Sequence, residues 1–359
     1  GAGFVEGAMK ADFAGGQQAD TATNTQPSPG ADIYGWNGYD NGAMRLEGEP
    51  RHGFGPVTVT TAGGTSAPFA LNELTQDFGN LRDVAFDPAT KSIWVADNIY
   101  PQTKLHRLDL ATGVELQSIS LTTKEYGSTY MSIAGLQITP AAFTLGTTAV
   151  PAGSLLVFDG DPNPDRVVAV DPTTGTVLGS LTLKGNYDLT AGLYDPTTKH
   201  MFLLNRSPNP RQVLEIDPAD GTVVSSFDSP LWGDEAGLAI DPVTNNFWFG
   251  SYNNPSVLLE MTRTGTVVRT INVGLQGIDQ SEISGLAFDD TGKLLVSSTQ
   301  GRVFQIDTKA DPGALSRPTL TGITASAFDG TPTDAGKASA NVGQVITLTG
   351  SNFGAGTQV

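Results

Sequence analysis

The sequence contains no cysteine, which excludes disulfide bonds, thiol chemistry and cysteine-based metal sites. Histidine is almost as scarce. His52, His106 and His200 are far apart in the sequence and lack the spacing of a zinc site. No apolar run approaches the roughly 18 residues that a membrane-spanning helix needs. We therefore expect neither a zinc centre nor a membrane span.

Basic residues are also few. The chain has 20 lysines and arginines against 37 aspartates and glutamates, giving a formal net charge of −17. No basic stripe is present that could neutralise a row of phosphate groups, so we expect no nucleic-acid partner. An acidic surface is compatible with bound divalent cations.

The motifs that announce common enzyme classes are missing as well. The sequence has no G-x-S-x-G element, no phosphate-binding loop and no dinucleotide-binding fingerprint. It begins without Met and ends at GAGTQV within a strand-like pattern. We therefore expect a piece of a longer protein or a processed chain, and nothing in the pattern requires an enzyme.

What the sequence does contain is typical of β-structure. There are 43 glycines and 22 prolines, and short alternating segments rich in Val, Thr, Ile and Phe are separated by DP, TG, NP and DG pairs. Long runs of good helix formers at helical spacing do not occur. This composition predicts an all-β fold.

A four-strand pattern repeats along the middle of the chain. Five first strands end at Asp87, Thr139, Asp195, Asp241 and Asp289, which are 52, 56, 46 and 48 residues apart. Second strands are predicted at 92–97, 154–159, 200–205, 246–251 and 293–298, third strands at 104–109, 166–171, 212–217, 257–262 and 302–307, and fourth strands at 113–121, 175–183, 221–227 and 265–273. This periodicity predicts a five-bladed β-propeller.

The fifth repeat has no fourth strand of its own. The segment APFALNEL, residues 67–74, precedes the first repeat and is the candidate for the missing strand. Pairing the two ends of the repeat array would close the ring and remove two sheet edges. A six-bladed alternative requires residues 1–56 to supply a blade, and no matching pattern occurs there.

The repeats resemble a known kind of propeller. The segments GLAFD and IWVADN and the third-strand turn ID-P-x-x-G are similar to those of the NHL/YVTN-type propellers of bacterial surface and secreted proteins. The resemblance covers about residues 80–310. It implies the fold and says little about the activity.

The two ends of the chain resemble parts of one further domain. The strand VITLTG (345–350) followed by SNFGAGTQV resembles the beginning of an IPT/TIG immunoglobulin-like domain. GAGF (1–4) matches GSNF (350–353), and residues 55–66 are similar to a closing strand pair. This implies three parts: the end of one Ig-like domain (1–66), the propeller (67–314) and the start of the next Ig-like domain (315–359).

The matching ends indicate a tandem array with a period near 349 residues. A half Ig-like domain leaves an apolar strand edge uncovered, so residues 319–359 of one unit are expected to pair with residues 1–65 of the next. The pairing would occur by chain continuity or by strand donation. The expected interface residues are Val345, Ile346, Leu348, Phe353, Phe4, Val57 and Val59.

Polar residues recur seven positions before each first-strand end. They are Asn80, Ser132, Asp188, Asp234 and Glu282. In a propeller they would lie near one mouth of the central channel, where Asn80, Asp188, Asp234 and Glu282 could hold a cation such as Ca²⁺. The alternative is that they cap strand starts and bind backbone amides.

A second candidate calcium site is the acidic loop 159–165, with Asp159, Asp161 and Asp165. Its spacing resembles the start of a calcium loop, but the Gly and Glu of an EF-hand loop are missing, and a rigid turn is the alternative. The residues that end the second strands are expected to bond the turn that follows. They are Asp97, Asp159, Asn205, Ser251 and Ser298.

Three functions remain open. The favoured hypothesis is a structural repeat module of an extracellular or cell-surface fibre, sheath or giant adhesin, with copies of itself as partners. The second is an adhesive propeller that binds glycans or proteins through the loops 98–104, 138–153 and 205–211. The third is a cation-dependent propeller enzyme of the lactonase or phosphoesterase kind, which has only the acidic channel residues, Glu282 among them, in its favour.

Overall fold

The computed structural model describes residues 10–12, 18–20, 32–35, 44–47, 52–61, 64–76, 78, 80–99, 102–121, 132–160, 165–206, 211–229, 235–251, 257–273, 283–309, 319–324, 329–330, 339, 341 and 347–351. Every regular element in these residues is a β-strand. The chain forms two compact units, Gly1–Asp307 and Thr308–Val359. The predicted boundaries at 66/67 and 314/315 stay predictions.

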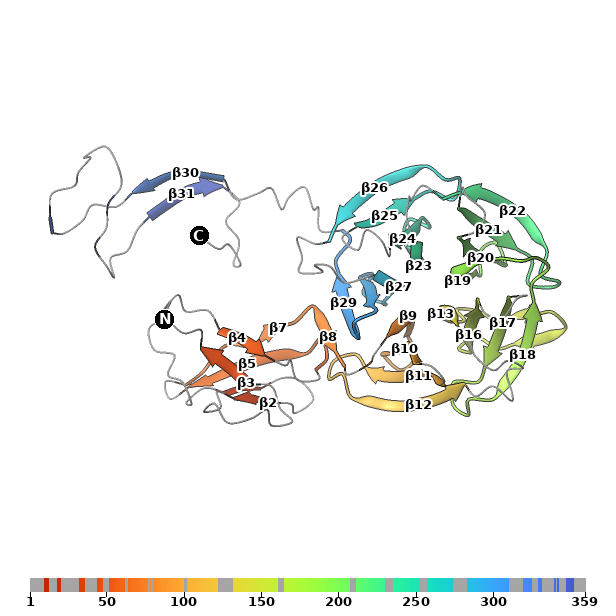
Figure 1. Cartoon of the computed structure of the whole chain (residues 1–359), viewed down its shortest axis with the longest axis horizontal. Helices are drawn as coiled ribbons and strands as arrows, with labels where there is room; N and C mark the ends of the chain where they lie inside the picture. The colour runs from red at the N-terminus through yellow and green to blue at the C-terminus, as the bar shows by residue number, and fades with distance from the viewer. Residues whose placement is uncertain are drawn as a thin grey trace. The chain divides into compact units, whose positions relative to one another are not determined.

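Five four-stranded antiparallel sheets surround a common axis in the first unit (Figure 1). From the innermost strand outward, the first blade consists of β9 (Leu81–Asp87), β10 (Ser92–Ile99), β11 (Gln102–Asp109) and β12 (Glu115–Leu121), and the second of β13 (Ile133–Ile138), β16 (Leu155–Asp159), β17 (Arg166–Val170) and β18 (Val177–Thr182). The third blade consists of β19 (Leu189–Asp195), β20 (His200–Asn205), β21 (Gln212–Ile216) and β22 (Val223–Asp228), and the fourth of β23 (Glu235–Ile240), β24 (Phe247–Ser251), β25 (Val257–Met261) and β26 (Val267–Asn272). The fifth blade consists of β27 (Ile283–Phe288), β28 (Leu294–Ser298), β29 (Arg302–Ile306) and β8 (Glu73–Thr75). Each innermost strand contacts the next, and β27 contacts β9. The all-β, five-bladed prediction is therefore confirmed.

The ring is closed by a strand from the start of the chain. β8 pairs antiparallel with β29, with Leu74 opposite Val303. Leu74 is fully buried between the last and first blades. The closing strand lies at the end of the predicted segment 67–74, because β7 (Phe69–Ala70) pairs instead with β5 (Pro56–Thr61).

Aspartates shape the hairpins that end the innermost strands. Asp195 Oδ1 accepts a hydrogen bond from the backbone N–H of Thr197 at 2.9 Å, and Asp241 Oδ1 accepts one from Val243 at 2.7 Å. Lys199 and Asn245 then adopt positive φ, 62° and 59°, where the chain turns back. The repeated Asp-Pro signal is thus a turn signal with a local cause.

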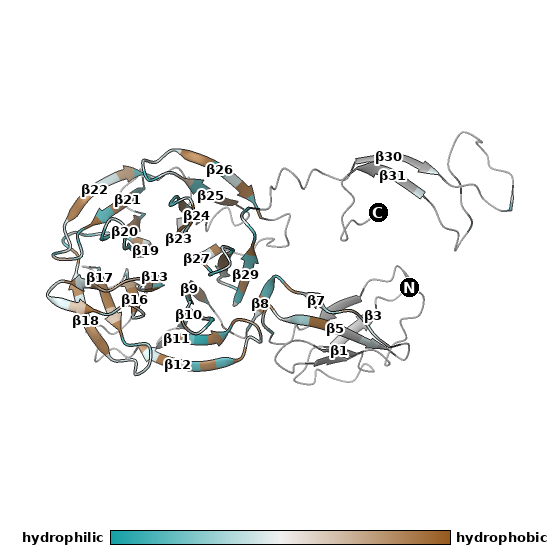
Figure 2. Cartoon of the chain, turned by 180° about the vertical axis from the view of Figure 1, so that it is seen from behind, coloured by the Kyte–Doolittle hydropathy of each residue, from teal (hydrophilic) through white to brown (hydrophobic). Residues whose placement is uncertain are grey.

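The core consists of apolar layers between neighbouring blades. Trp94 and Trp248 are fully buried on second strands, in the layers between the first and second blades and between the fourth and fifth. Hydrophobic segments also occur on the outermost strands, as Figure 2 shows for β22 and β26. Val224 and Val268 on these strands are half exposed.

Two further sheets flank the propeller in the sequence. The first has the order β4 (Met44–Glu47), β3 (Asp32–Gly35), β2 (Gln18–Asp20), β1 (Lys10–Asp12), β5 and β6 (Gly64–Thr65), with β7 paired to β5. The second, in the Thr308–Val359 unit, is the antiparallel pair β30 (Thr319–Thr324) and β31 (Thr347–Ser351).

The residues predicted at the interface between units are only partly described. Val57 and Val59 lie in β5, where Val57 is half-buried, and Leu348 lies in β31. Phe4, Val345, Ile346 and Phe353 lie outside the described residues. The Ig-like assignment of the two flanks stays a prediction.

Candidate functional site: the channel and the axial cavity

The channel mouth at the start of the innermost strands is built by side chains from the second strands. Asp97 Oδ1 accepts a hydrogen bond from the Asn80 backbone N–H at 3.3 Å, and Asp159 Oδ1 accepts one from Ser132 at 3.0 Å. Asn205 Oδ1 accepts the Asp188 N–H at 2.9 Å. The sequence predicted that these side chains bond the turn after their own strand, and Ser298 does so, since its Oγ accepts from the Gln300 N–H. Asp97, Asp159 and Asn205 instead accept from the residue that leads into the innermost strand of the same blade.

The candidate channel cation remains a prediction. Asp234 and Glu282 lie outside the described residues. Asp188 is described, and both its oxygens accept from the guanidinium of Arg206, at 2.8 and 3.1 Å. Within the described ranges, no group of three or more His, Asp or Glu side chains is arranged to hold a metal ion.

In the candidate calcium loop, two carboxylates already have protein donors. Asp159 is fully buried and its Oδ2 accepts from Arg166 Nε at 2.9 Å. Asp165 is 1% exposed and accepts from the Tyr187 N–H at 3.2 Å. Asp161 lies outside the described residues. These contacts fix the first and last aspartates of the loop, and the calcium site stays a prediction.

One channel residue was not found from the sequence. Four positions before the end of each innermost strand, the other blades carry Gly135, Ala191, Gly237 and Gly285, whereas the first blade carries Asp83. Small residues are needed here because the strands converge: a Cβ on Gly135 would lie 2.5 Å from the Gly192 backbone N. Aligning the five repeats at this position would have revealed the exception.

Asp83 joins three neighbouring inner strands, β27, β9 and β13. Its Oδ1 accepts the Val84 N–H at 2.8 Å and its Oδ2 accepts the Leu136 N–H at 2.6 Å. The Leu286 backbone N–H also bonds it, and Gly285 leaves the space for its side chain. Burial raises the pKa of Asp83 well above its usual value, against the lowering effect of these backbone bonds. We call this level of the channel the waist.

Beyond the waist, at the ends of the innermost strands, lies an axial cavity of about 720 Å³. All five innermost strands line it with their last residues. Nearest the waist are Ala85, Leu136, Leu193, Leu238 and Leu286; next come Phe86, Ile138, Tyr194, Ile240 and Phe288; and at the rim are Asp87, Thr139, Asp195, Asp241 and Asp289.

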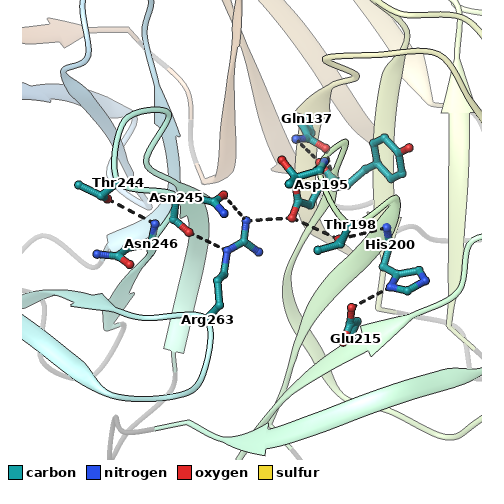
Figure 3. Close-up of polar contacts among 11 residues, drawn as sticks. Gln137, Asp195, Thr198, His200, Glu215, Thr244, Asn245, Asn246 and Arg263 are labelled. Atoms are coloured by element: carbon teal, nitrogen blue, oxygen red, sulfur yellow. Dashed lines mark hydrogen bonds and ion pairs between the residues drawn. The ribbon is translucent and has the colours of Figure 1, made fainter.

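Polar contacts hold three blades together at this rim. Gln137 bonds both backbone groups of Tyr194, accepting from its N–H at 2.7 Å and donating to its carbonyl at 3.0 Å. Figure 3 shows Arg263 between Asn245 and Asp195; its Nη2 donates to Asp195 Oδ2 at 2.9 Å. Its guanidinium also lies 4.2 Å from the ring centroid of Phe247.

The rim is acidic. Asp195 is paired with Arg263, and Asp290 is paired with Lys91. In the part of the chain that the structure describes, Asp87, Asp241 and Asp289 have no ion-pair partner and bond turn amides and polar side chains. Among the described residues, three carboxylates thus lie at the rim of an apolar cavity without an ion-pair partner of their own.

The fold and the cavity define a closed five-bladed β-propeller with an acidic-rimmed axial cup. No protein-family model matches the chain, and no curated protein matches it. Solved structures show a weak likeness. The glutaminyl cyclase of Myxococcus xanthus is 12% identical with a TM-score of 0.49, and the match covers 66% of this chain and 94% of that chain.

Two further structures are similar at the same level. The calcium-binding protein regucalcin of Agrobacterium tumefaciens is 14% identical with a TM-score of 0.38, covering 62% of this chain and 68% of that chain. Hydrazine synthase of Kuenenia stuttgartiensis is 13% identical with a TM-score of 0.41, covering 71% and 90%. Likenesses this weak carry no argument about what this chain does.

A search of the described residues finds no helix with the length and hydrophobicity to cross a membrane.

Proposed function

We propose that the chain is a structural repeat module of an extracellular or cell-surface fibre, sheath or giant adhesin. The propeller is a side disc of NHL/YVTN type, and the flanking IPT/TIG-like segments join neighbouring units. The observation that carries this proposal is the pairing of β8 with β29. The chain reaches the propeller and leaves it on the same blade.

This pairing makes the propeller an insertion in a longer path. β8 begins at Glu73 and β29 ends at Ile306, so the two connecting segments start beside each other. A pulling force on the two flanking segments can then be transmitted between them without loading the other blades. A rigid disc with both connections at one edge suits a lateral decoration on a fibre.

The flanking unit also favours completion by a partner. Its described sheet has two strands, β30 and β31. An isolated two-stranded sheet is marginally stable in water, and unpaired edges attract further strands. Residues 1–65 of a neighbouring copy are the expected source of those strands, by donation or by chain continuity.

The test is the state of association in solution. Sedimentation velocity of the full chain over a wide concentration range should show concentration-dependent assembly, and a chain ending at Asp307 should stay monomeric. Leu348→Asp should weaken the assembly, whereas Val243→Asp, at a position 70% exposed on a turn of the propeller, should not. A full chain that stays a monodisperse monomer at every concentration would contradict the proposal.

An adhesive propeller is the second candidate, because one of its predicted binding loops is ordered at the cavity. Residues 138–153 contain the hairpin β14 (Phe143–Leu145) and β15 (Thr148–Val150), and Phe143 stacks on Tyr194 at 4.1 Å between ring centroids. Pro140 and Gly153 line the cavity. A glycan array with the full chain tests it, with loss of signal expected on deleting the hairpin.

A further inference from the structure

We propose that the axial cavity binds a small organic ammonium ion with an aromatic or alkyl body. The proposal does not depend on the assembly role above. It rests on three features of the cavity: an apolar wall, a closed inner end and an acidic rim.

The wall offers an apolar surface of suitable size. Leu136, Leu238 and Leu286 lie nearest the waist, and Phe86, Tyr194 and Phe288 line the next layer. A volume of about 720 Å³ lies within the range of small-molecule sites, roughly 300–1,000 Å³. An apolar ligand body of one or two rings can therefore be buried in this cavity, away from water.

The inner end is closed at the waist. Asp83 accepts from the N–H groups of Leu136 and Leu286, which line the cavity, and at 3% exposure its side chain is shielded from solvent at this inner end. The glycines on the neighbouring strands let the backbones approach closely at the same level. The cavity is thus a cup that opens at the rim, and a ligand enters from one side with its charged end left at the rim.

The charge of the rim selects the charge of the ligand. The carboxylates of Asp87, Asp241 and Asp289 border the cavity without an ion-pair partner among the described residues. Each accepts hydrogen bonds from its own turn and is therefore held in place rather than free to turn away. An ammonium group at this height meets several negative charges, whereas a carboxylate is repelled by them.

Aromatic rings in the wall add to the preference for a cation. Phe86 and Phe288 each directly precede a rim aspartate in the sequence, and both line the cavity. Rings within about 6 Å of an ammonium attract it through their negative faces. The structure already uses this contact once, between Arg263 and Phe247.

The experiment compares two probes with the same aromatic body and opposite charge. Isothermal titration calorimetry of the full chain with 1-naphthylmethylammonium should show saturable binding at one site per chain. Binding of 1-naphthylacetate should be at least about tenfold weaker, and added salt should narrow the difference. No saturable binding of the ammonium, or equal binding of both probes, would overturn the proposal.

Variants locate the site. Ala287→Trp places a large side chain in the cavity from a half-buried position and should abolish binding. Asp241→Asn with Asp289→Asn keeps an oxygen acceptor for each turn and should weaken ammonium binding about fivefold. Asp171→Asn is the matched control, because Asp171 caps a similar turn through Thr173 outside the cavity. Equal loss in the control would place the effect elsewhere.

Fold integrity is checked by thermal melts of each variant before titration. If Ala287→Trp fails to fold, NMR saturation transfer on the wild-type chain keeps the test decisive. Saturating the naphthyl protons of the bound ammonium should transfer saturation to the ring protons of Tyr194 and Phe288. Saturation that instead maps to residues outside the cavity would contradict the proposal.

Discussion

At the scale of single residues, the channel waist depends on one carboxylate. Asp83 occupies a position that glycine or alanine holds in the other inner strands, and it bonds backbone amides from the first, second and fifth blades. It therefore ties the blades on both sides of the closure point. A buried group with this many partners is costly to remove, because the amides are left without an acceptor.

The pH dependence of stability reports on Asp83. Its pKa is raised in the folded chain, mainly by burial, so the folded state binds the proton more tightly than the unfolded state. This contribution is complete below about pH 4 and is lost as the pH rises through the folded-state pKa. Urea denaturation of wild type and Asp83→Asn should show the wild type losing stability relative to the variant as pH rises. If the stability of the wild type relative to Asp83→Asn stays constant or increases as the pH rises, this assignment is contradicted.

Arg263 is predicted to be the most important cation of the rim. It is paired with Asp195, whose side chain is 2% exposed, so Arg263→Ala leaves a buried charge without its partner. We expect a loss of about 3 kcal/mol in the free energy of unfolding. Lys184→Ala is the matched control, because Lys184 and Asp220 form an exposed pair, and its effect on the free energy of unfolding should be much smaller. Equal losses in the two variants would refute the role given to Arg263.

Local sequence patterns predict some of these residues and not others. The first-strand aspartates are identifiable because Asp and a Thr two residues later form a turn, with Pro between them at Asp195 and Asp between them at Asp289. Asp83 and Arg263 are not, because their partners come from distant segments: Leu136 is 53 residues from Asp83, and Asp195 is 68 residues from Arg263. Such pairs exist only after the ring has closed.

At the scale of elements, β8 is the strand on which the ring depends. It contributes three paired residues to the last blade, and the buried Leu74 fills the layer against the first blade. The segment before β5 also reaches this point, since His52 pairs with Thr75 and the Phe54 N–H donates to the Leu110 carbonyl at 3.0 Å. The closure is thus supported from both neighbouring blades.

Truncating Leu74 tests this dependence. Leu74→Ala removes a fully buried side chain and should lower the free energy of unfolding by about 3 kcal/mol. Leu116→Ala is the control: Leu116 is 50% exposed just inside the start of the first blade's outer strand, and its loss should cost less than about 0.5 kcal/mol. Urea denaturation followed by tryptophan fluorescence measures both. Similar costs would show that β8 is not needed for closure.

The strand pattern was predictable from period-two alternation and regular turn signals, because each blade is built from local hairpins. Two elements differed. The closing strand β8 (Glu73–Thr75) covers only the last two residues of 67–74 and extends one residue beyond it, while Phe69 and Ala70 pair with β5. The segment 138–153, expected as a binding loop, contains a hairpin that turns at Gly146, with φ 61° and its N–H bonded to the Pro218 carbonyl of the next blade.

At the scale of the whole molecule, the sequence predicts a propeller with a split domain around it. The propeller was predictable because its repeats are internal and its closure uses the same chain. The partners of the flanking strands were not, because the expected partner segments are distant in the sequence or belong to another copy. The axial cup was also missed, since it forms only when five strand ends meet.

The proposed assembly through the flanks has a structural competitor, the outer edges of the blades. Exposed valines on β22 and β26 could also associate edge to edge, as unpaired strands do. Val223, Val224, Val267 and Val268 are 44–51% exposed. Sedimentation alone would not separate these two modes of association.

Hydrogen–deuterium exchange of the full chain, at concentrations below and above assembly, separates them most directly. If units join through the flanking strands, the amides of β31 (Thr347–Ser351) should exchange more slowly in the assembly, while those of β22 and β26 stay unchanged. Protection that appears on β22 and β26 with β31 unchanged would contradict the account.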